Sequence, residues 1–98
     1  MVREVKDLLR VSVALRNLAF EHESGGQRQV AINYLEQAST VCRDIKNRAG
    51  EATAMRDLGR IHESLNQHQK ALEYFNKALS IYRTVSNLAG EEIGRAHV

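Results

Sequence analysis

The chain contains two consecutive copies of one forty-residue unit, and this repeat constrains the fold more than any other feature. When the 98-residue sequence is shifted along itself by forty places without a gap, residues 51–90 fall on residues 11–50 with 15 identities in 40 positions. The longest identical run places His22-Glu23-Ser24 on His62-Glu63-Ser64. A fixed period of this length is typical of repeat arrays in which each unit packs on its neighbours. The sequence therefore predicts a solenoid.

Composition indicates that the repeat unit is helical. The sequence has no proline, 43% apolar residues and only five aromatic residues, and it is rich in Ala, Leu, Glu, Gln and Arg. These residues have high helix propensities, and 98 residues suffice for one compact unit. The predicted fold class is all-α, a solenoid of helical hairpins.

Charge and cysteine content restrict the partner and the compartment. The formal net charge of +2 is too small to indicate nucleic acid by itself. Cys42 is the single cysteine, so an internal disulfide is excluded and a reducing compartment is favoured. The N-terminal residues lack the apolar segment of a signal peptide, and no run is long enough to span a membrane. We expect a cytoplasmic protein with no membrane segment.

Apolar spacing predicts two helices in each copy. In the first copy the helices are expected over Leu9–Ser24 and Arg28–Ile45, because apolar residues recur at intervals of three and four. Gly26 is suited to a left-handed residue at the end of the first helix, and Asn66 stands at the same place in the second copy. The connector Lys46–Gly50 separates the copies.

Each helix has one stripe of residues expected to be buried. In the first copy these stripes are Leu15, Leu18, Ala19 and His22, followed by Ala31, Ile32, Leu35, Ala38, Val41, Cys42 and Ile45. In the second copy they are Met55, Leu58, Gly59 and His62, followed by Ala71, Leu72, Phe75, Ala78, Ile81, Tyr82 and Val85. Phe75 replaces Leu35 and Tyr82 replaces Cys42, so we expect the second hairpin to be the better packed.

The repeat register divides the whole chain into four parts. Residues 1–10 are expected to be the tail of a preceding repeat and a connector, because the first six residues resemble those forty places later. Residues 11–50 and 51–90 are the two complete repeats, and residues 91–98 are the truncated start of a third. Such arrays usually need about three units for stability. We therefore expect marginal stability and self-association through the uncovered ends.

These residues resemble the tetratricopeptide repeat family. The family spacing of Leu-Gly, Tyr, Ala, Phe and Ala is followed by Leu58-Gly59, His62, Ala71, Phe75 and Ala78, and by Leu18-Ala19, His22, Ala31, Leu35 and Ala38. The forty-residue period and the Asn-Arg-Ala-Gly-Glu connector are similar to the long-repeat variety of Pins-type scaffold proteins. Met55 and Leu15 replace the usual Trp, and the proline that closes shorter repeats is absent.

The resemblance implies a protein-interaction module, an adaptor or scaffold segment folded as a right-handed superhelix. In the family the first helix of each hairpin lines a concave groove that binds a partner peptide. Carried over position by position, the groove residues are Val13, Arg16, Asn17, Phe20, Arg56, Asp57 and Arg60, with Glu23, Ser24, Thr53, Glu63 and Ser64 beside them. Because arginine recurs at positions 16 and 56, we expect an acidic partner. Some members bind a C-terminal carboxylate with Lys, Arg and Asn at set groove positions. Phe20 and Asp57 stand at two of the places where Asn is expected, so we do not expect this carboxylate clamp here.

Two alternatives remain open at this point. Asp57 and Glu63 are able to pair with the arginines, which would then be structural residues. A helical-repeat RNA-binding module has a similar repeat length, although the weak basic charge disfavours nucleic acid. A steep salt dependence of binding would identify the RNA-binding function.

Catalytic, metal and cofactor sites are not expected. His62-Glu63 begins like the zinc motif H-E-x-x-H, but Asn66 occupies the place of the second histidine. His22 and His62 are matched packing positions in the two copies. Cys42 lies on an apolar stripe, which favours a structural thiol over a nucleophile. We predict that the protein is not an enzyme, binds no metal and needs no cofactor.

Overall fold

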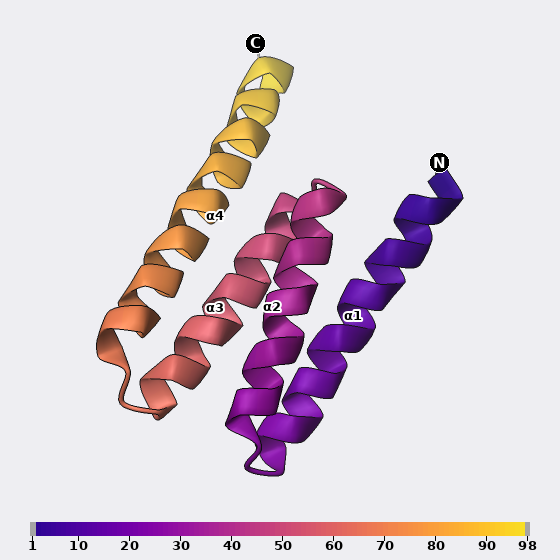
Figure 1. The fold of residues 1–98 in the computed structure, drawn as a ribbon. Helices are drawn as coiled ribbons and strands as arrows, with labels where there is room; N and C mark the ends of the chain where they lie inside the picture. Colours follow the sequence, from indigo (N-terminus) through magenta and orange to yellow (C-terminus); the bar gives the residue numbers. More distant parts are fainter. Residues whose placement is uncertain (1, 98) are drawn as a thin grey trace.

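The protein is an all-α chain of two helical hairpins. The computed structural model describes the backbone of residues 2–97 and the side chains of residues 4–86. Its helices are α1 (Val2–Ser24), α2 (Arg28–Asp44), α3 (Arg48–Ser64) and α4 (His68–His97). Figure 1 shows α1 with α2 and α3 with α4 as the two hairpins, and residues 2–97 contain no strand. The predicted fold class, an all-α repeat of helical hairpins, is confirmed.

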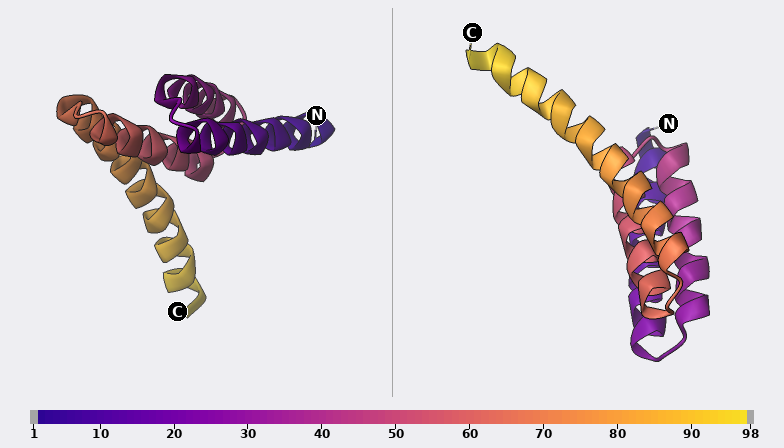
Figure 2. Two further views of the ribbon diagram at one scale, coloured as in Figure 1. Left: turned by 90° about the horizontal axis from the view of Figure 1, so that it is seen from below. Right: turned by 90° about the vertical axis from the view of Figure 1, so that its left-hand side faces the viewer.

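The two hairpins stack into an elongated, thin molecule. Helix α2 packs against both α1 and α3, and α4 packs against α3. The principal extents are 51 × 34 × 18 Å. Both chain ends lie at the same end of the molecule, and Figure 2 shows the C-terminal half of α4 leaning away from the other helices. Helices α2 and α3 are therefore covered from two sides and contribute most of the core.

Three turns of one design join the helices, and they recur every twenty residues. Gly26, Lys46 and Asn66 each have a positive φ, of 82°, 60° and 61°. The N–H of each donates to the carbonyl three residues earlier, and the following N–H donates to the carbonyl five residues earlier. These paired bonds satisfy carbonyl groups that a helix end leaves free. The left-handed conformations predicted for Gly26 and Asn66 are confirmed, whereas that of Lys46 was not anticipated.

The residue that follows each left-handed position stands directly before the next helix, and in two turns its side chain also fixes a histidine. Gln67 places its Oε1 2.6 Å from Nδ1 of His62. Since Oε1 is an acceptor, Nδ1 must carry the proton. The imidazole of His62 stacks on Tyr74 with ring centres 5.3 Å apart, and the first copy repeats both contacts around His22. Both histidines are packing residues, as predicted.

The core lies where α2 and α3 meet. Its largest fully buried side chains are Leu35, Leu58, Ile61 and Cys42. Small buried residues surround them and let the helix backbones approach closely, namely Ala19, Ala31, Ala38, Ala52 and Ala54. Cys42 is a buried free thiol, which agrees with the structural role predicted for it.

A glycine and a phenylalanine are matched to each other in the second hairpin. A Cβ atom on Gly59 would lie 2.8 Å from the ring of Phe75, so the ring fills the space that a methyl group would need. The first hairpin has Ala19 and Leu35 at the corresponding positions. Leu35 is fully buried because α3 covers α2, whereas Phe75 is only half-buried. At this position the second hairpin is therefore not the better packed of the two.

The helices extend beyond their predicted boundaries near both ends of the chain. The predicted connector Asp7–Arg10 is helical, and α1 begins at Val2. The segment Asp7–Arg10 consists largely of good helix formers and lacks the Gly and Asn of the connector at 46–50. Helix α4 likewise continues through residues 87–90, without the turn that the repeat register predicts there. The side chains of the predicted third repeat, residues 91–98, lie outside the described residues.

Two leucines predicted to be buried are exposed. Leu18 and Leu72 both lie on apolar stripes, yet both are substantially accessible to solvent. Their repeat counterparts, Leu58 and Ile32, are buried because α2 and α3 pack on each other. Within the described part of the chain, no further helix packs on the outer sides of α1 and α4. Burial at these positions therefore depends on a neighbouring hairpin, as the physics of repeat arrays requires.

Candidate functional site

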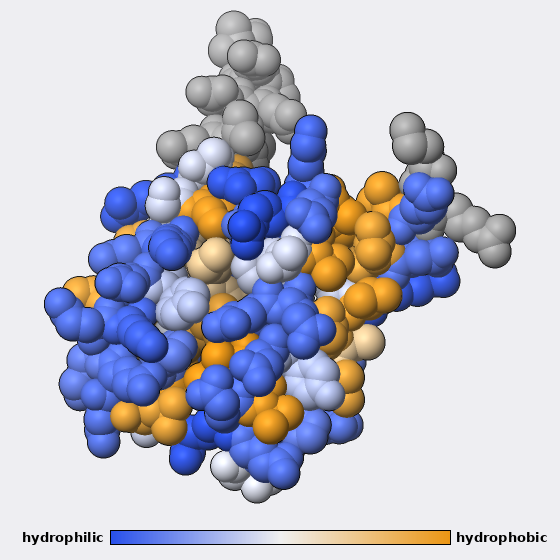
Figure 3. Space-filling view, in the orientation of Figure 1, coloured by the Kyte–Doolittle hydropathy of each residue, from blue (hydrophilic) through white to orange (hydrophobic). Residues whose placement is uncertain are grey.

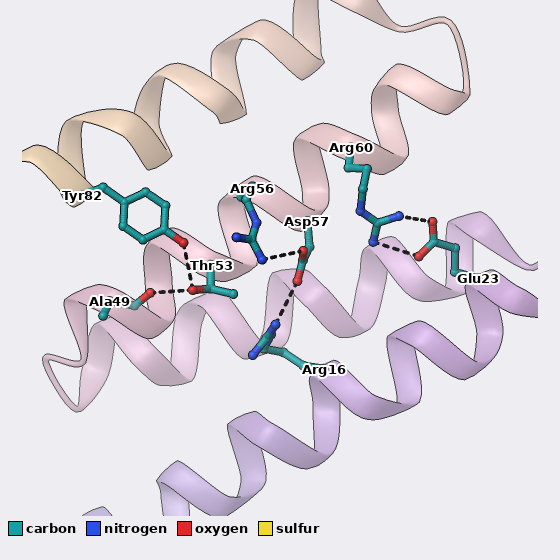
Figure 4. Close-up of polar contacts among 8 residues, drawn as sticks. All are labelled: Arg16, Glu23, Ala49, Thr53, Arg56, Asp57, Arg60 and Tyr82. Carbon is teal, nitrogen blue, oxygen red and sulfur yellow. Dashed lines mark hydrogen bonds and ion pairs between the residues drawn. The ribbon is translucent and has the colours of Figure 1, made fainter.

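The predicted groove residues lie where α1 and α3 run side by side, and Figure 4 shows the polar contacts there. We call this surface the α1–α3 face and define it by its central residues: Arg16, Phe20 and Glu23 of α1, and Thr53, Arg56, Asp57 and Arg60 of α3. On each helix these residues recur at intervals of three and four. They therefore share one side of their helix.

An ion pair joins α1 to α3. Arg60 donates from Nη1 and Nη2 to Oε2 and Oε1 of Glu23, at 2.6 and 3.0 Å. Two parallel bonds of this kind are the strongest form of arginine–carboxylate contact. The hydrogen bond to Glu23 raises the pKa of Arg60 above its usual value, and partial burial opposes this effect without cancelling it. Arg60 is thus held by Glu23, whereas sequence analysis had considered Asp57 and Glu63 as partners of the arginines.

A buried carboxylate, that of Asp57, holds the other two arginines. Its Oδ2 accepts a hydrogen bond of 3.2 Å from Nη2 of Arg16, which comes from α1. Arg56 approaches Oδ1 at 3.7 Å, a distance that gives an ion pair but no hydrogen bond. The side chain of Arg56 is 57% exposed and that of Arg16 is 28% exposed. Arg56 is therefore the more weakly held and the more accessible of the two.

Phe20 lies beside both ion pairs. The guanidinium carbons of Arg16 and Arg60 are each 5.8 Å from the centre of its ring. At this distance a cation–π contact contributes about 0.5–1 kcal/mol at an exposed site. The ring is partly exposed. Phe20 therefore supports the two arginines in addition to offering an apolar surface, whereas the sequence predicted only the apolar surface.

Tyr82 of α4 also reaches this face, and sequence reasoning placed it in the core instead. Thr53 Oγ1 donates to the carbonyl of Ala49 at 2.9 Å, and a hydroxyl has only one proton. In the 3.0 Å contact between Thr53 Oγ1 and Tyr82 Oη, the tyrosine must therefore be the donor. The remaining lone pairs of Tyr82 Oη are left as acceptors. The sequence did contain a signal for this position of Tyr82: the second copy has this large polar-tipped residue where the first copy has the small Cys42.

The structure brings most of the predicted groove residues into one connected network. Its members are Arg16, Phe20, Arg56, Asp57 and Arg60, joined by Glu23. Val13 and Asn17 are exposed on α1 beside this network. Glu63, the other carboxylate considered as a partner of the arginines, contacts His68 at 3.0 Å instead.

Two further classes of site were tested among the described residues. Residues 4–86 contain no group of three or more His, Cys, Asp or Glu side chains placed to hold a metal ion. Within the same part of the structure, no helix combines the length and the apolar character needed to cross a membrane.

Comparison with known proteins agrees with the architecture. The family model for the tetratricopeptide repeat matches residues 10–84, a range that includes the entire α1–α3 face and Tyr82. No curated protein and no solved structure matches the chain significantly. The matched range covers more than half of the sequence and includes residues of all four helices. The chain belongs to the tetratricopeptide repeat family, whose repeats are non-catalytic modules that generally mediate protein–protein interactions.

Proposed function

We propose that this chain is a protein-interaction module, a segment of an adaptor or scaffold, that binds a partner peptide in a concave groove along the α1–α3 face. The proposed site consists of Val13, Arg16, Asn17, Phe20, Arg56, Asp57 and Arg60. The observation that carries the proposal is the state of Arg56. Its guanidinium is exposed in the middle of this face and is held only by an ion pair of 3.7 Å. Such a group retains donors for a ligand.

The charge of the face favours an acidic partner. Three arginines, at positions 16, 56 and 60, stand against two carboxylates, Glu23 and Asp57. The face therefore keeps one positive charge in excess. Complementary charge speeds encounter and selects the partner more than it adds affinity. A carboxylate of the partner is best placed on Arg56, because Arg60 already has both of its terminal nitrogens bonded to Glu23.

The hydrogen-bonding groups around Arg56 fit an extended peptide. Arg56 offers donors, and Tyr82 Oη offers an acceptor because its proton is given to Thr53. An extended peptide supplies both complements, a carboxylate or carbonyl for the arginine and an N–H for the tyrosine oxygen. The exposed part of the Phe20 ring accepts an apolar side chain. The partner proposed is thus an acidic segment with an interspersed apolar residue.

The finer classification of the chain belongs to the same proposal. We infer that residues 11–50 and 51–90 are its repeat units and that they are of the long-repeat variety, because the identities follow a forty-residue period. A cytoplasmic location is proposed because the single cysteine, Cys42, is a buried free thiol that forms no internal disulfide.

Fluorescence anisotropy with two labelled peptides tests the proposed function. One peptide alternates glutamate with glycine around a central leucine, and the other has glutamine in place of every glutamate. The acidic peptide is expected to bind, with an affinity that falls as salt is added. Arg56→Gln, which removes the accessible charge, should weaken its binding by about tenfold or more, the loss expected for one charge-assisted hydrogen bond.

The control is Arg28→Gln, which removes an exposed arginine from the start of α2, outside the α1–α3 face. This variant should bind the acidic peptide like the unchanged protein. Equal binding of the two peptides, or an equal loss in both variants, would overturn the assignment of Arg56 to the partner site.

A further inference from the structure

Two outer surfaces of the molecule correspond to a buried interface inside it. That internal interface is formed by α2 and α3, which pack on each other. Ile32 of α2 belongs to one buried cluster with Leu58 and Ile61 of α3, and Ser39 of α2 is equally buried. The forty-residue period gives every residue of this interface a counterpart, either on α4 or on α1. The state of these counterparts can be compared directly.

On α4 two counterparts are exposed, and one of them is more apolar than the original. Leu72 stands forty residues after Ile32 and is 55% exposed, whereas Ile32 is 3% exposed. Leu79 stands forty residues after Ser39 and is 46% exposed, whereas Ser39 is 3% exposed. An isolated exposed leucine needs no explanation, but two at the positions of a repeat interface form a surface suited to another helix.

On α1 the counterparts of the α3 residues are also exposed. Leu18 stands forty residues before the fully buried Leu58, and Val11 stands forty residues before the buried Glu51. Val11 is 45% exposed. Next to these residues lies an open hollow of about 660 Å³ between α1 and α2, lined by Val11, Leu15 and Val41 among others. In the second hairpin, α2 itself packs at the corresponding place.

We propose that these two surfaces bind each other between copies of this chain, so that the outer side of α1 in one copy packs on the outer side of α4 in the next. The contact reproduces between two chains the packing of α3 on α2 within one chain. Each copy then uses two different surfaces, and such a contact produces an open row of molecules rather than a closed pair. The α1–α3 face takes no part, so this association is independent of the proposed peptide site.

Charge complementarity favours this pairing of unlike surfaces. The outer side of α1 carries Glu4, Asp7 and Glu21. Arg83 of α4 is the counterpart of Arg43, whose Nε lies 3.7 Å from Glu51 at the start of α3. In the repeat register Arg83 therefore lies beside the first turns of the neighbouring α1. The counterpart of Glu51 there is Val11, and the acidic residue nearby is Asp7, one helical turn earlier.

The position of Glu21 also favours the packing of α1 of one copy on α4 of the next. Glu21 is the counterpart of the buried Ile61, and a carboxylate without a polar partner would oppose burial of this surface. The end of α1 that carries Glu21 would meet the start of α4, whose first turn contains no acidic residue. Free backbone N–H groups at a helix start stabilise a nearby carboxylate by about 0.3–1 kcal/mol. A symmetric pairing of α1 with α1 would instead bring the acidic residues of both copies together, which costs energy.

The lengths of the two outer helices fit the proposed contact. Helix α1 has 23 residues where α3 has 17, and α4 has 30 where α2 has 17. The first residues of α1 and the last residues of α4 lie at the same end of the molecule (Figure 1). In the antiparallel register of α2 and α3, the extension of α1 in one copy runs alongside the extension of α4 in the next.

The hydropathy of the surface is consistent with a contact near α1. Figure 3 shows hydrophobic residues gathered along the α1 side of the molecule in the orientation of Figure 1. Of the large exposed apolar residues, Leu8, Val11 and Leu18 share the outer side of α1, because three and seven residues separate them. Burial of such side chains supplies the driving force for association, at roughly 25 cal/mol per Å² of apolar surface.

Sedimentation equilibrium of the whole chain over a wide concentration range tests the proposal. The average mass should rise above 11.1 kDa and continue to rise without a plateau at the dimer. Leu18→Glu on α1 and Leu72→Glu on α4 should each stop this growth and leave monomers, because each places a carboxylate at a position whose counterpart, Leu58 or Ile32, is buried in the internal interface. The matched control is Val13→Glu, since Val13 is 48% exposed on the same helix but lies on the α1–α3 face. Far-UV circular dichroism verifies that all variants remain helical.

An equimolar mixture of Leu18→Glu and Leu72→Glu gives the most direct result. The first variant retains an intact α4 surface and the second retains an intact α1 surface, so together they should form a dimer that cannot grow. Three results would overturn the proposal: a monomeric unchanged chain at all concentrations, a dimer formed by either variant alone, or a mixture that stays monomeric. Loss of association in Val13→Glu to the same degree as in Leu18→Glu would also overturn it.

Discussion

Arg60 on α3 and Glu23 on α1 form a bidentate ion pair, with hydrogen bonds of 2.6 and 3.0 Å, across two helices that are first in their hairpins. Arg16 and Asp57 make a second link between the same helices. Other described contacts between α1 and α3 are sparse, because α2 packs against both of these helices. The two ion pairs therefore fix how the first helices lie beside each other, and with that the shape of the α1–α3 face.

The bidentate pair should stabilise the fold modestly. In a double-mutant cycle with Glu23→Gln and Arg60→Gln, the coupling free energy should be about 0.5–1 kcal/mol, because both side chains are partly exposed. Urea titrations at low salt and at high salt measure it, and the coupling should shrink with added salt. A coupling of zero at low salt would mean that this pair does not hold the helices together.

Asp57 should be the more critical carboxylate. Asp57→Asn removes the charge that Arg16 and Arg56 share while the site stays buried, so we expect a loss of about 1–3 kcal/mol in the free energy of unfolding. The control is Asp44→Asn, at an exposed position in the last turn of α2, where removal of a negative charge should be neutral or slightly stabilising. Equal effects of the two changes in urea titrations would contradict the structural role assigned to Asp57.

Gly59 and Phe75 should behave as a coupled pair. Gly59→Ala puts a methyl group 2.8 Å from the Phe75 ring, so a loss of about 1–3 kcal/mol is expected despite the better helix propensity of alanine. Adding Phe75→Leu recreates the Ala19–Leu35 combination of the first hairpin and should recover part of this loss. Thermal or urea unfolding of the two single variants and the double variant measures the coupling. Additive effects would show that the ring does not contact the Gly59 backbone closely.

The three turns should respond differently to glycine. Lys46 takes a positive φ at a cost that glycine avoids, so Lys46→Gly should stabilise the protein by up to about 1 kcal/mol. Asn66→Gly should change stability less, because asparagine adopts this conformation more readily than lysine. Gly26→Val should destabilise by more than the helix propensity of valine explains. Equilibrium unfolding ranks the variants, and a destabilising Lys46→Gly would contradict the observed turn.

The fold was predictable because a forty-residue period and helical apolar spacing leave few arrangements open. Gly26 and Asn66 indicated their turns in the sequence, since both residue types adopt a left-handed conformation readily. Lys46 has no such preference, and only its place twenty residues from each of the others would have revealed its turn. The straight course of α1 through Asp7–Arg10 was missed because sequence register suggested a connector where the residues themselves favour a helix.

The sequence predicted which residues share the α1–α3 face, but it did not predict which of them pair with each other. Spacing at three and four residues placed Arg16, Arg56 and Arg60 on the first helices, yet their partners depend on how far one hairpin is shifted along the next. The two links between the hairpins have sequence separations of 41 and 37 residues, close to the period but not equal to it. That shift is set by packing in the core around Leu58 and Ile61, and the period alone does not specify it.

The measurement that tests the central claim most directly is a nuclear magnetic resonance titration of the isotope-labelled chain with the acidic peptide described above. If the α1–α3 face binds the partner, the side-chain Nε–H signal of Arg56 and the signals of Phe20 and Tyr82 should shift in a saturable way. The signals of Leu72 and Val30, exposed outside this face, should stay in place. The glutamine peptide should cause much smaller shifts. Saturable shifts confined to the outer sides of α2 and α4, with the Arg56 signal unchanged, would contradict the assignment of partner binding to the α1–α3 face.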